Sequence, residues 1–265
     1  MNELLIKMNP DFDDPCKRSL TLPEEFFLLL IDKVSGKIPK SVVPLFYGFI
    51  GVGIAELLLI GKLTMEKQNG AFNIQNMNVK VIDFSPTQDE FLNYVLSKIA
   101  KRKTPTTISR NILYIGNNVY QKNLKRVNNT IAKSLMKKNI LTVSETMKNL
   151  FGTRYSYNIL DLESKNNIEM SCCKLISGLL NSSQQPEGLI RETILLLTLK
   201  QYTYVTSKPL ISDFLERNYP INQHKQISDC IKILESTIKS PKLDDPIHKM
   251  LNLIMTGIRG AFDSD

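Results

Sequence analysis

Five basic residues along one segment, with no acidic residue among them, are the strongest indication of chemistry in this sequence. When residues 119–138 are placed on a helix at about 100° per residue, the five fall on one side. They are Lys122, Lys125, Arg126, Lys133 and Lys137. An exposed helix ordinarily balances such charges with ion pairs between residues four positions apart, and these are missing here. We therefore expect a positive field that attracts anions such as lipid phosphates, with a plain solvated helix face as the alternative.

The opposite side of the same helix is apolar. Leu124, Val127, Ile131 and Leu135 fall on one narrow face, which is the spacing of a stripe that packs against a protein core. The segment is therefore predicted to be an amphipathic helix that presents its basic side outward.

A second segment mixes aromatic and basic side chains. We predict a hairpin whose strands cover residues 140–144 and 158–162, and whose tip carries Leu150, Phe151, Arg154 and Tyr155 together with Tyr157. Rings settle at the headgroup level of a bilayer while cations meet phosphate. Leu150, Phe151, Arg154 and Tyr155 are therefore the predicted membrane-inserting residues. The alternative is that these rings pack against the helices.

Catalytic and metal-binding patterns are missing from the sequence. His224 and His248 have no nucleophile or carboxylate at a recognisable spacing. The four cysteines form no C-x-x-C pair, which disfavours a zinc site and favours a reducing, intracellular setting. They are Cys16, Cys172, Cys173 and Cys230. We expect no catalytic residue, no metal and no cofactor, and hence a protein that is not an enzyme.

The composition indicates a globular protein with an anionic partner but does not identify that partner. The 265 residues are 42% hydrophobic and 23% charged, which is enough to bury one large core. The net charge of +8 favours an anionic partner: nucleic acid, a membrane surface or an acidic protein.

The order of sequence patterns predicts a mainly α protein, a single globular helical domain with two or three small β-hairpins. Residues 1–18 are expected to form a polar tail, and residues 19–265 the domain. Residues 63–66 and 79–84 are the predicted strands of a first hairpin, followed by helices over 88–101, 106–114 and 119–138. Residues 167–262 are expected to form four or five helices, broken at Pro186, Pro209, Pro220 and Pro241.

Residues 42–60 are apolar almost throughout and approach the length of a membrane span. The run contains Pro44, three glycines and Glu56. These residues favour a buried central helix, packed closely through its small residues, in which Glu56 finds a polar partner.

Three phrases of the sequence resemble one known family. A Leu-Thr-Leu-x-Glu-Glu phrase begins the first predicted helix. A Gly-rich and Leu-rich helix follows and ends at a Gly-Lys-Leu phrase. An Ala-Lys-x-Leu phrase ends the basic helix. In these phrases the chain resembles the Golgi phosphoprotein 3 family of membrane-surface adaptors. The matching residues are Leu20, Thr21, Leu22, Glu24 and Glu25, then Gly51, Glu56, Leu57, Gly61, Lys62 and Leu63, and then Ala132, Lys133, Leu135 and Leu141.

The resemblance implies a function. Family members bind phosphatidylinositol 4-phosphate and the cytoplasmic tails of membrane proteins, so we expect a peripheral adaptor on a cytoplasmic membrane surface, Golgi-like in a eukaryotic host. A homo-oligomer stays open. The family's headgroup pocket would fall at Ser41, Ile50, Lys125 and Asn128. Only Lys125 carries charge, and lysine cannot form the bidentate phosphate contact of arginine.

Two other classes remain open from the sequence. A basic helical protein that binds nucleic acid would also explain the charge, because the five-residue basic face could follow a phosphate backbone. The chain has no zinc-finger or nucleoprotein signature, which disfavours this reading. A protein scaffold with an acidic partner is the other alternative.

Overall fold

The computed structural model describes residues 20–38, 43–67, 77–117, 122–149, 152–181, 189–201, 210–239 and 246–262. The predicted fold class is confirmed: the described residues form a mainly α structure with two small antiparallel sheets. The elements are α1 (Leu22–Leu30), α2 (Val43–Leu59), β1 (Leu63–Lys67), β2 (Met77–Val81), α3 (Glu90–Ala100), α4 (Ile108–Asn117), α5 (Lys122–Lys137), β3 (Leu141–Asn149), β4 (Gly152–Ile159), α6 (Leu162–Asn181), α7 (Ile190–Gln201), α8 (Leu210–Asn218), the short 3-10 helix η3 (Ile221–Gln223), α9 (His224–Lys239) and α10 (Pro246–Phe262).

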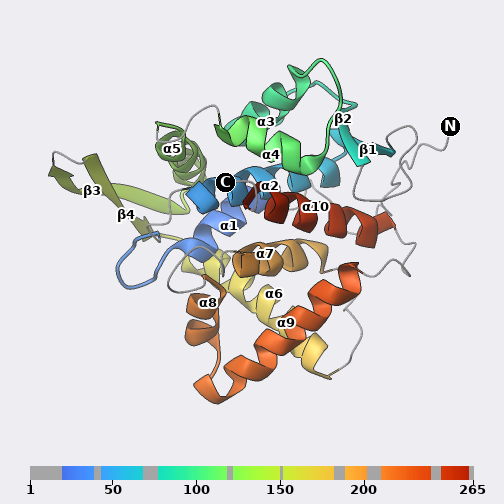
Figure 1. The fold of residues 1–265 in the computed structure, drawn as a ribbon. Helices are drawn as coiled ribbons and strands as arrows, with labels where there is room; N and C mark the ends of the chain where they lie inside the picture. The colour runs from blue at the N-terminus through green and yellow to red at the C-terminus, as the bar shows by residue number, and fades with distance from the viewer. Residues whose placement is uncertain are drawn as a thin grey trace.

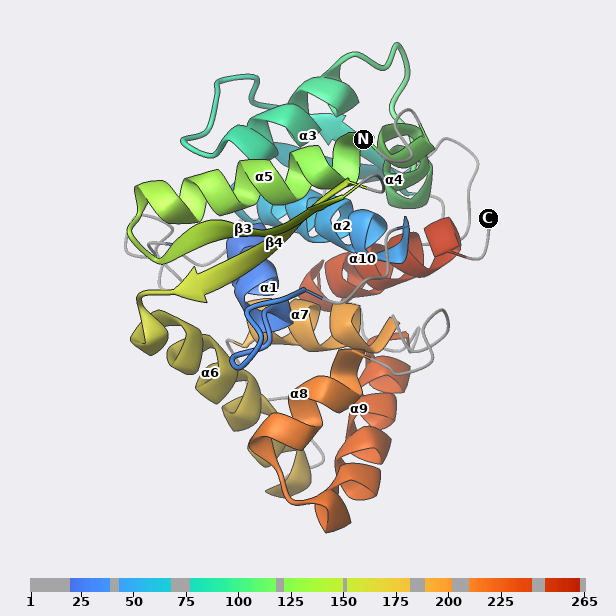
Figure 2. The same cartoon turned by 90° about the vertical axis from the view of Figure 1, so that its left-hand side faces the viewer.

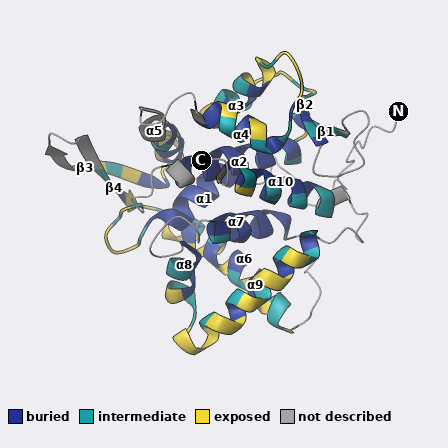
Figure 3. Cartoon of the chain, viewed as in Figure 1, coloured by how far each residue is buried: buried dark blue, intermediate teal, exposed yellow. Residues whose placement is uncertain are grey.

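Helices α1, α2 and α7 lie at the centre of the molecule, with α3, α4 and α5 on one side and α6, α8 and α9 on the other (Figure 1). All nine residues of α1 are buried, and so are all residues of α7 except Lys200. Figure 3 shows both helices dark blue, whereas α9 keeps an exposed outer side. Because helices that are apolar around most of their circumference must be enclosed, these sequences place α1 and α7 inside.

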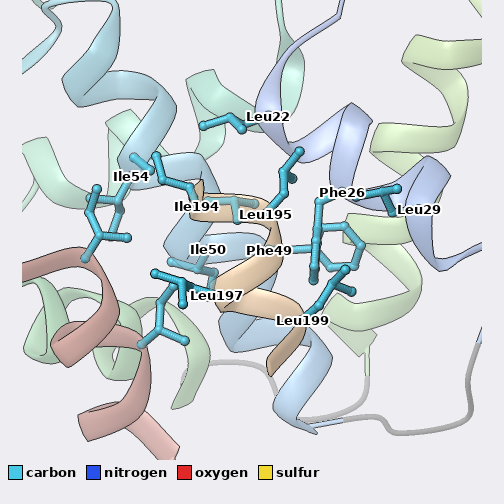
Figure 4. Close-up of a cluster of buried hydrophobic side chains, with 14 of the residues drawn as sticks. Leu22, Phe26, Leu29, Phe49, Ile50, Ile54, Ile194, Leu195, Leu197 and Leu199 are labelled. Carbon is cyan, nitrogen blue, oxygen red and sulfur yellow. The ribbon is translucent and has the colours of Figure 1, made fainter. Parts of the chain in front are cut away.

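The core between these helices is built from aliphatic and aromatic side chains (Figure 4). The rings of Phe26 on α1 and Phe49 on α2 meet edge to face, with their centroids 5.2 Å apart. Such ring pairs stabilise a core beyond the area that they bury. Ile194 and Leu197 from α7 lie in the same cluster, so one contiguous core spans all three helices.

Helix α2 is the buried central helix that residues 42–60 were predicted to form. A Cβ atom on Gly51 would lie 2.4 Å from Cγ1 of Ile258, and one on Gly53 would lie 3.1 Å from Cε1 of Phe91. The glycines therefore allow α10 and α3 to approach the helix closely, as predicted. Among the described residues, no helix combines the length and apolar character that crossing a membrane requires.

The start of α1 is held by buried ionic groups. Arg191 on α7 donates from Nη1 to Glu56 at 2.7 Å, and its Nη2 lies 3.1 Å from Oε2 of Glu25. Its guanidinium also reaches the backbone oxygen of Leu20, while Glu56 accepts the N–H of Leu22 at 3.2 Å. Burial alone would lower the pKa of Arg191, but the two carboxylates raise it. The predicted polar partner of Glu56 is thus Arg191, and the expectation is confirmed.

The end of α1 is held by cations. Lys165 on α6 is fully buried and donates to the backbone oxygens of Leu28 at 2.5 Å and Ile31 at 2.9 Å. Arg217 on α8 donates to the oxygen of Leu29 at 3.1 Å. The last carbonyl groups of a helix lack partners within the helix, so these side chains satisfy groups that would otherwise be buried unpaired.

Both predicted hairpins are present, with strand limits that differ from the prediction. In the first, Leu63 pairs with Val81 and Lys67 with Met77, so the second strand begins and ends earlier than predicted. The β3–β4 hairpin extends much further toward its tip than residues 140–144 and 158–162, because Leu141–Asn149 pairs with Gly152–Ile159. Many residues of these strands are polar, so a hydrophobic pattern does not reveal how far each strand extends. The length of each strand is set by backbone hydrogen bonds to its partner strand.

The described C-terminal half contains five α-helices, in agreement with the prediction. The first, α6, begins at Leu162 and not near residue 167, because Asp161 accepts the N–H of Ser164 at 3.0 Å and caps it. Pro220 precedes η3 as expected. The other predicted breaks, Pro186, Pro209 and Pro241, lie outside the described residues, and so does the polar tail of residues 1–18.

The lowered pKa of Lys165 predicts how the stability of the fold changes with pH. Burial lowers its pKa from 10.5 to about 8, partly opposed by the nearby Glu169 carboxylate. Between these two pH values the unfolded chain binds one more proton here than the folded chain, so this residue's contribution to the free energy of unfolding rises with pH. We expect the free energy of unfolding of the parent, minus that of Lys165→Met, to increase by on the order of 2–3 kcal/mol over this interval.

Urea unfolding of both chains at a series of pH values measures this difference. Buried tyrosine and cysteine groups with raised pKa values, such as Tyr157 and Cys172, are present in both chains and cancel in the difference. A difference that stays constant with pH would contradict the assignment.

Candidate functional site

Helix α5 has the amphipathic arrangement that its sequence predicts. Val127, Ile131 and Leu135 are buried, and the helix packs against α1, α3 and β3. Leu124 lies on the helix, but its side chain is outside the described part. The apolar face thus fixes which side of α5 points outward.

The outward side of α5 carries the predicted basic residues for which side chains are described. Lys133 and Lys137 are both exposed. The backbone places Lys122, Lys125 and Arg126 on the first part of the helix, and their side chains lie outside the described residues. We refer to Lys133 and Lys137 as the lysine pair of α5.

Lys138, the next residue along the chain, has a different role. Its Nζ lies 2.7 Å from Oε2 of Glu24, a side chain with no solvent exposure at the start of α1. The same oxygen accepts the N–H of Thr21 at 2.7 Å, which forms part of a capping box at the start of α1. Burial raises the pKa of the neighbouring Asp89, Glu24 raises it further, and Lys138 opposes both. Lys138 therefore fastens the end of α5 to α1.

The β3–β4 hairpin projects from the body of the molecule next to α5 (Figures 1 and 2). Strand pairing places Tyr155 opposite Glu145 and Tyr157 opposite Val143, so neither tyrosine lies at the tip, where the sequence had placed them. Tyr155 is half-buried and packs against the core. The pairing of β3 with β4 therefore places both tyrosine rings nearer to the helices than to the tip of the hairpin.

Of the other predicted hairpin residues, the structure describes only the backbone of Arg154. Arg154 pairs with Met147 on β3, after an irregularity in the register that begins at Glu145, and its side chain is outside the described part. Leu150 and Phe151 connect the two strands in the sequence and lie outside the described residues. Their role at the tip stays a prediction.

The base of the hairpin is anchored on α1. The ring of Tyr157 meets the ring of Phe27 edge to face, with centroids 5.1 Å apart and an interplanar angle of 85°. Burial raises the pKa of Tyr157 to about 12, so its hydroxyl stays neutral. The hairpin is therefore held in a definite direction relative to α5, because both elements pack on the same helix.

A cavity of about 280 Å³ lies between α3 and α5. Its described lining residues include Glu90, Tyr94 and Thr130, and among them are a carboxylate but no lysine or arginine. These described residues by themselves offer no cation to a phosphate group. The described residues also contain no cluster of three histidine, cysteine or acidic side chains that could hold a metal ion.

Comparison with known proteins agrees with the geometry. The family model described as Golgi phosphoprotein 3 (GPP34) matches residues 22–216. The chain belongs to the Golgi phosphoprotein 3 family. A VPS74-like protein of Dictyostelium discoideum is 38% identical over 265 residues, covering 97% of this chain and 100% of the relative. The resemblance seen in the sequence is confirmed, and family membership implies a Golgi-associated adaptor.

The sequence predicted that the headgroup pocket of this Golgi phosphoprotein 3 family member would fall at Ser41, Ile50, Lys125 and Asn128. Ile50 is fully buried in the core and cannot contact a headgroup (Figure 4). Asn128 is half-buried, and its side-chain oxygen is buried without a hydrogen-bond partner among the described residues. Ser41 and the side chain of Lys125 lie outside the described part. Neither described side chain supplies charge for a phosphate.

Sequence reasoning missed two features of this region. It assigned no role to Lys138, because only the fold brings Glu24 beside it. It also did not find the exposed aliphatic side chain of Val34 in the loop after α1. Nothing in the local pattern distinguishes that valine from one that is buried in a core.

The lysines at the end of α5 are expected to differ sharply in their effect on stability. Lys138→Met leaves the buried Glu24 without its cation and should lower the free energy of unfolding by about 1–3 kcal/mol. Lys133→Met and Lys137→Met remove exposed charges and should each change it by less than about 0.5 kcal/mol. Chemical unfolding of the three variants measures this, and equal effects would contradict the distinction.

Proposed function

We propose that this protein is a peripheral membrane adaptor that binds anionic, phosphoinositide-type headgroups at a cytoplasmic membrane surface and recruits or retains membrane-protein cargo. The observation that carries the proposal is the position of the lysine pair of α5, on an outward helix face beside a projecting hairpin (Figure 2). Membership of the Golgi phosphoprotein 3 family supports the adaptor role. A Golgi membrane is the proposed location in a eukaryotic host.

The energetics require two kinds of contact. Each basic residue near an anionic leaflet contributes about 1 kcal/mol. The five basic residues of α5 together give about 5 kcal/mol, a dissociation constant of order 0.1–1 mM. This attraction is too weak to hold a protein on a membrane, and it fades within about 10 Å of the surface. Apolar insertion by the hairpin tip, at Leu150 and Phe151, would supply the remainder.

The proposed partners follow from this arrangement. One side of the molecule faces anionic lipid, with phosphatidylinositol 4-phosphate among the candidates, and another side stays free for the cytoplasmic tails of membrane proteins. No cofactor enters the proposal, because recruitment requires binding alone.

Charge reversal on α5 tests the proposal. Lys133→Glu combined with Lys137→Glu removes two cations and adds two anions, so binding to anionic liposomes should fall by about thirtyfold or more. The matched control is Lys225→Glu with Lys232→Glu, which makes the same change in net charge at exposed positions of α9. Liposome flotation should show near-parental binding for the control. Equal losses in both variants would contradict a specific role for α5.

Nucleic-acid binding through the same lysines would also be lost in that variant, so a second substitution separates the two functions. Phe151→Asp leaves α5 intact and places a carboxylate where an inserted ring would contribute about 1.5–3 kcal/mol. Liposome affinity should fall more than about tenfold, and binding to a DNA or RNA duplex should not change. A folded variant that floats as well as the parent would overturn the hairpin contact.

Headgroup choice should follow total charge. Among the family's pocket positions only Lys125 is basic, and lysine acts on phosphate as a point charge without the paired geometry of arginine. Liposomes of equal charge with and without phosphatidylinositol 4-phosphate should therefore bind within a few-fold of each other. A preference above about tenfold, or 1.4 kcal/mol, would show that other residues form a specific pocket.

A further inference from the structure

The loop that follows α1 is tightly built. Asp32 accepts both the N–H and the hydroxyl of Ser35 at 2.7 Å, which closes a turn around residues 33 and 34. The hydrogen bond from the Ser35 backbone is the main reason that the pKa of Asp32 is lowered. The N–H of Asp32 donates to the oxygen of Lys37 at 3.0 Å, so the two ends of the loop are joined.

The same loop is fastened to its neighbours. Gly36 has a φ of +62°, and a Cβ atom there would lie 2.7 Å from the backbone oxygen of Tyr157. Its oxygen accepts the N–H of Tyr157 at 2.7 Å, which ties the loop to β4. Lys33 lies 2.7 Å from Glu169, which ties it to α6. The conformation of the loop is therefore determined by contacts on both sides of Val34.

Although its conformation is fixed by these contacts, the loop has a solvent-exposed aliphatic side chain. Val34 is 97% exposed, and Leu162, the first residue of α6, is 53% exposed. Val34 and Leu162 line one cavity of about 270 Å³. We call Val34 and Leu162 the loop patch. Single exposed aliphatic residues are common, but two that line one cavity beside a fixed loop point to a surface that another apolar phase covers.

The position of the loop patch points to lipid as that phase. The loop lies on the side of the molecule that carries β3, β4 and α5, and these segments face the viewer together in Figure 2. Lys37 is exposed beside the patch, Lys33 is paired with Glu169, and the carboxylate of Glu163 is exposed next to Leu162. Asp32 and Asp161 are engaged in local hydrogen bonds. These hydrogen bonds leave both aspartates ionised, so the four carboxylates outnumber Lys33 and Lys37 and the surroundings of the patch are acidic. Attraction to lipid at this place would therefore be apolar and not electrostatic.

We infer that the loop patch is a separate membrane contact, in which Val34 enters the interface of the same bilayer that the lysine pair of α5 approaches. The inference rests on the proposed membrane function and adds a contact to it. Because this contact is apolar, its contribution to affinity should hardly change with salt, whereas the contribution of the lysine pair should fall as salt screens it.

The absence of tryptophan from the 265 residues permits a direct test. Val34→Trp introduces a single indole at the tip of the loop. Phe84→Trp is the matched control, because Phe84 is 69% exposed and follows β2, on the far side of the molecule from β3 and β4 (Figure 1). Each variant is mixed with anionic vesicles that contain lipids brominated on their acyl chains, which quench indole fluorescence at short range.

The expected result is a blue shift and strong quenching for Val34→Trp, with neither change for Phe84→Trp. In a parallel flotation series, Val34→Ser should bind anionic vesicles about tenfold more weakly than the parent. That ratio should stay the same at low and high salt. Circular dichroism of each variant verifies the fold.

Three results would overturn the inference. If the parent floats but the indole of Val34→Trp is not quenched, the loop patch does not contact lipid. A protein partner would then be the alternative occupant of the patch. If both tryptophan variants are quenched equally, the contact is not specific to this side of the molecule. If the parent itself does not float with anionic vesicles, the proposed function fails and the loop contact fails with it.

Discussion

Helix α1 is buried along its whole length, and the rest of the structure depends on satisfying its two ends. A helix starts with unpaired N–H groups and finishes with unpaired carbonyl groups, which water cannot reach here. Carboxylates of Glu24 and Glu56 serve the start, and the cations of Lys165 and Arg217 serve the end. This arrangement also matches the helix dipole. Because these side chains come from α2, α6 and α8 as well as α1, satisfying the ends determines how those helices surround it.

The same helix orients the surface proposed to meet a membrane. Lys138 joins the end of α5 to the start of α1 through Glu24, and Tyr157 joins the base of the hairpin to α1 through Phe27. Two contacts that are individually weak become effective when they are held together, since the second forms at a high local concentration. A buried, well-satisfied helix is thus a physical requirement for a surface that works through several modest contacts.

The chemistry of that surface differs from a headgroup pocket. A pocket needs desolvated, rigid donors in a fixed geometry, but Ile50, one of the positions predicted for the family's pocket, is part of the core. The lysine pair of α5 stays hydrated and exposed, which suits attraction to a charged surface more than selection of one phosphate position. In the proposed arrangement, apolar side chains on ordered backbone supply the attraction that salt does not screen.

The amphipathic pattern of α5, the central burial of α2 and the adaptor family were determined by the sequence alone. Each depends on local periodicity or on a short phrase such as the one from Leu20 to Glu25, which are properties of consecutive residues. Tertiary structure decided the strand lengths of the hairpin, the pairing of Arg191 with Glu56, and the exposure of Val34. The strands of the hairpin are neighbours in the chain, but their polar residues do not show where pairing begins and ends. Arg191 and Glu56 lie 135 positions apart, and neither a charge nor a valine carries local information about what the fold will place beside it.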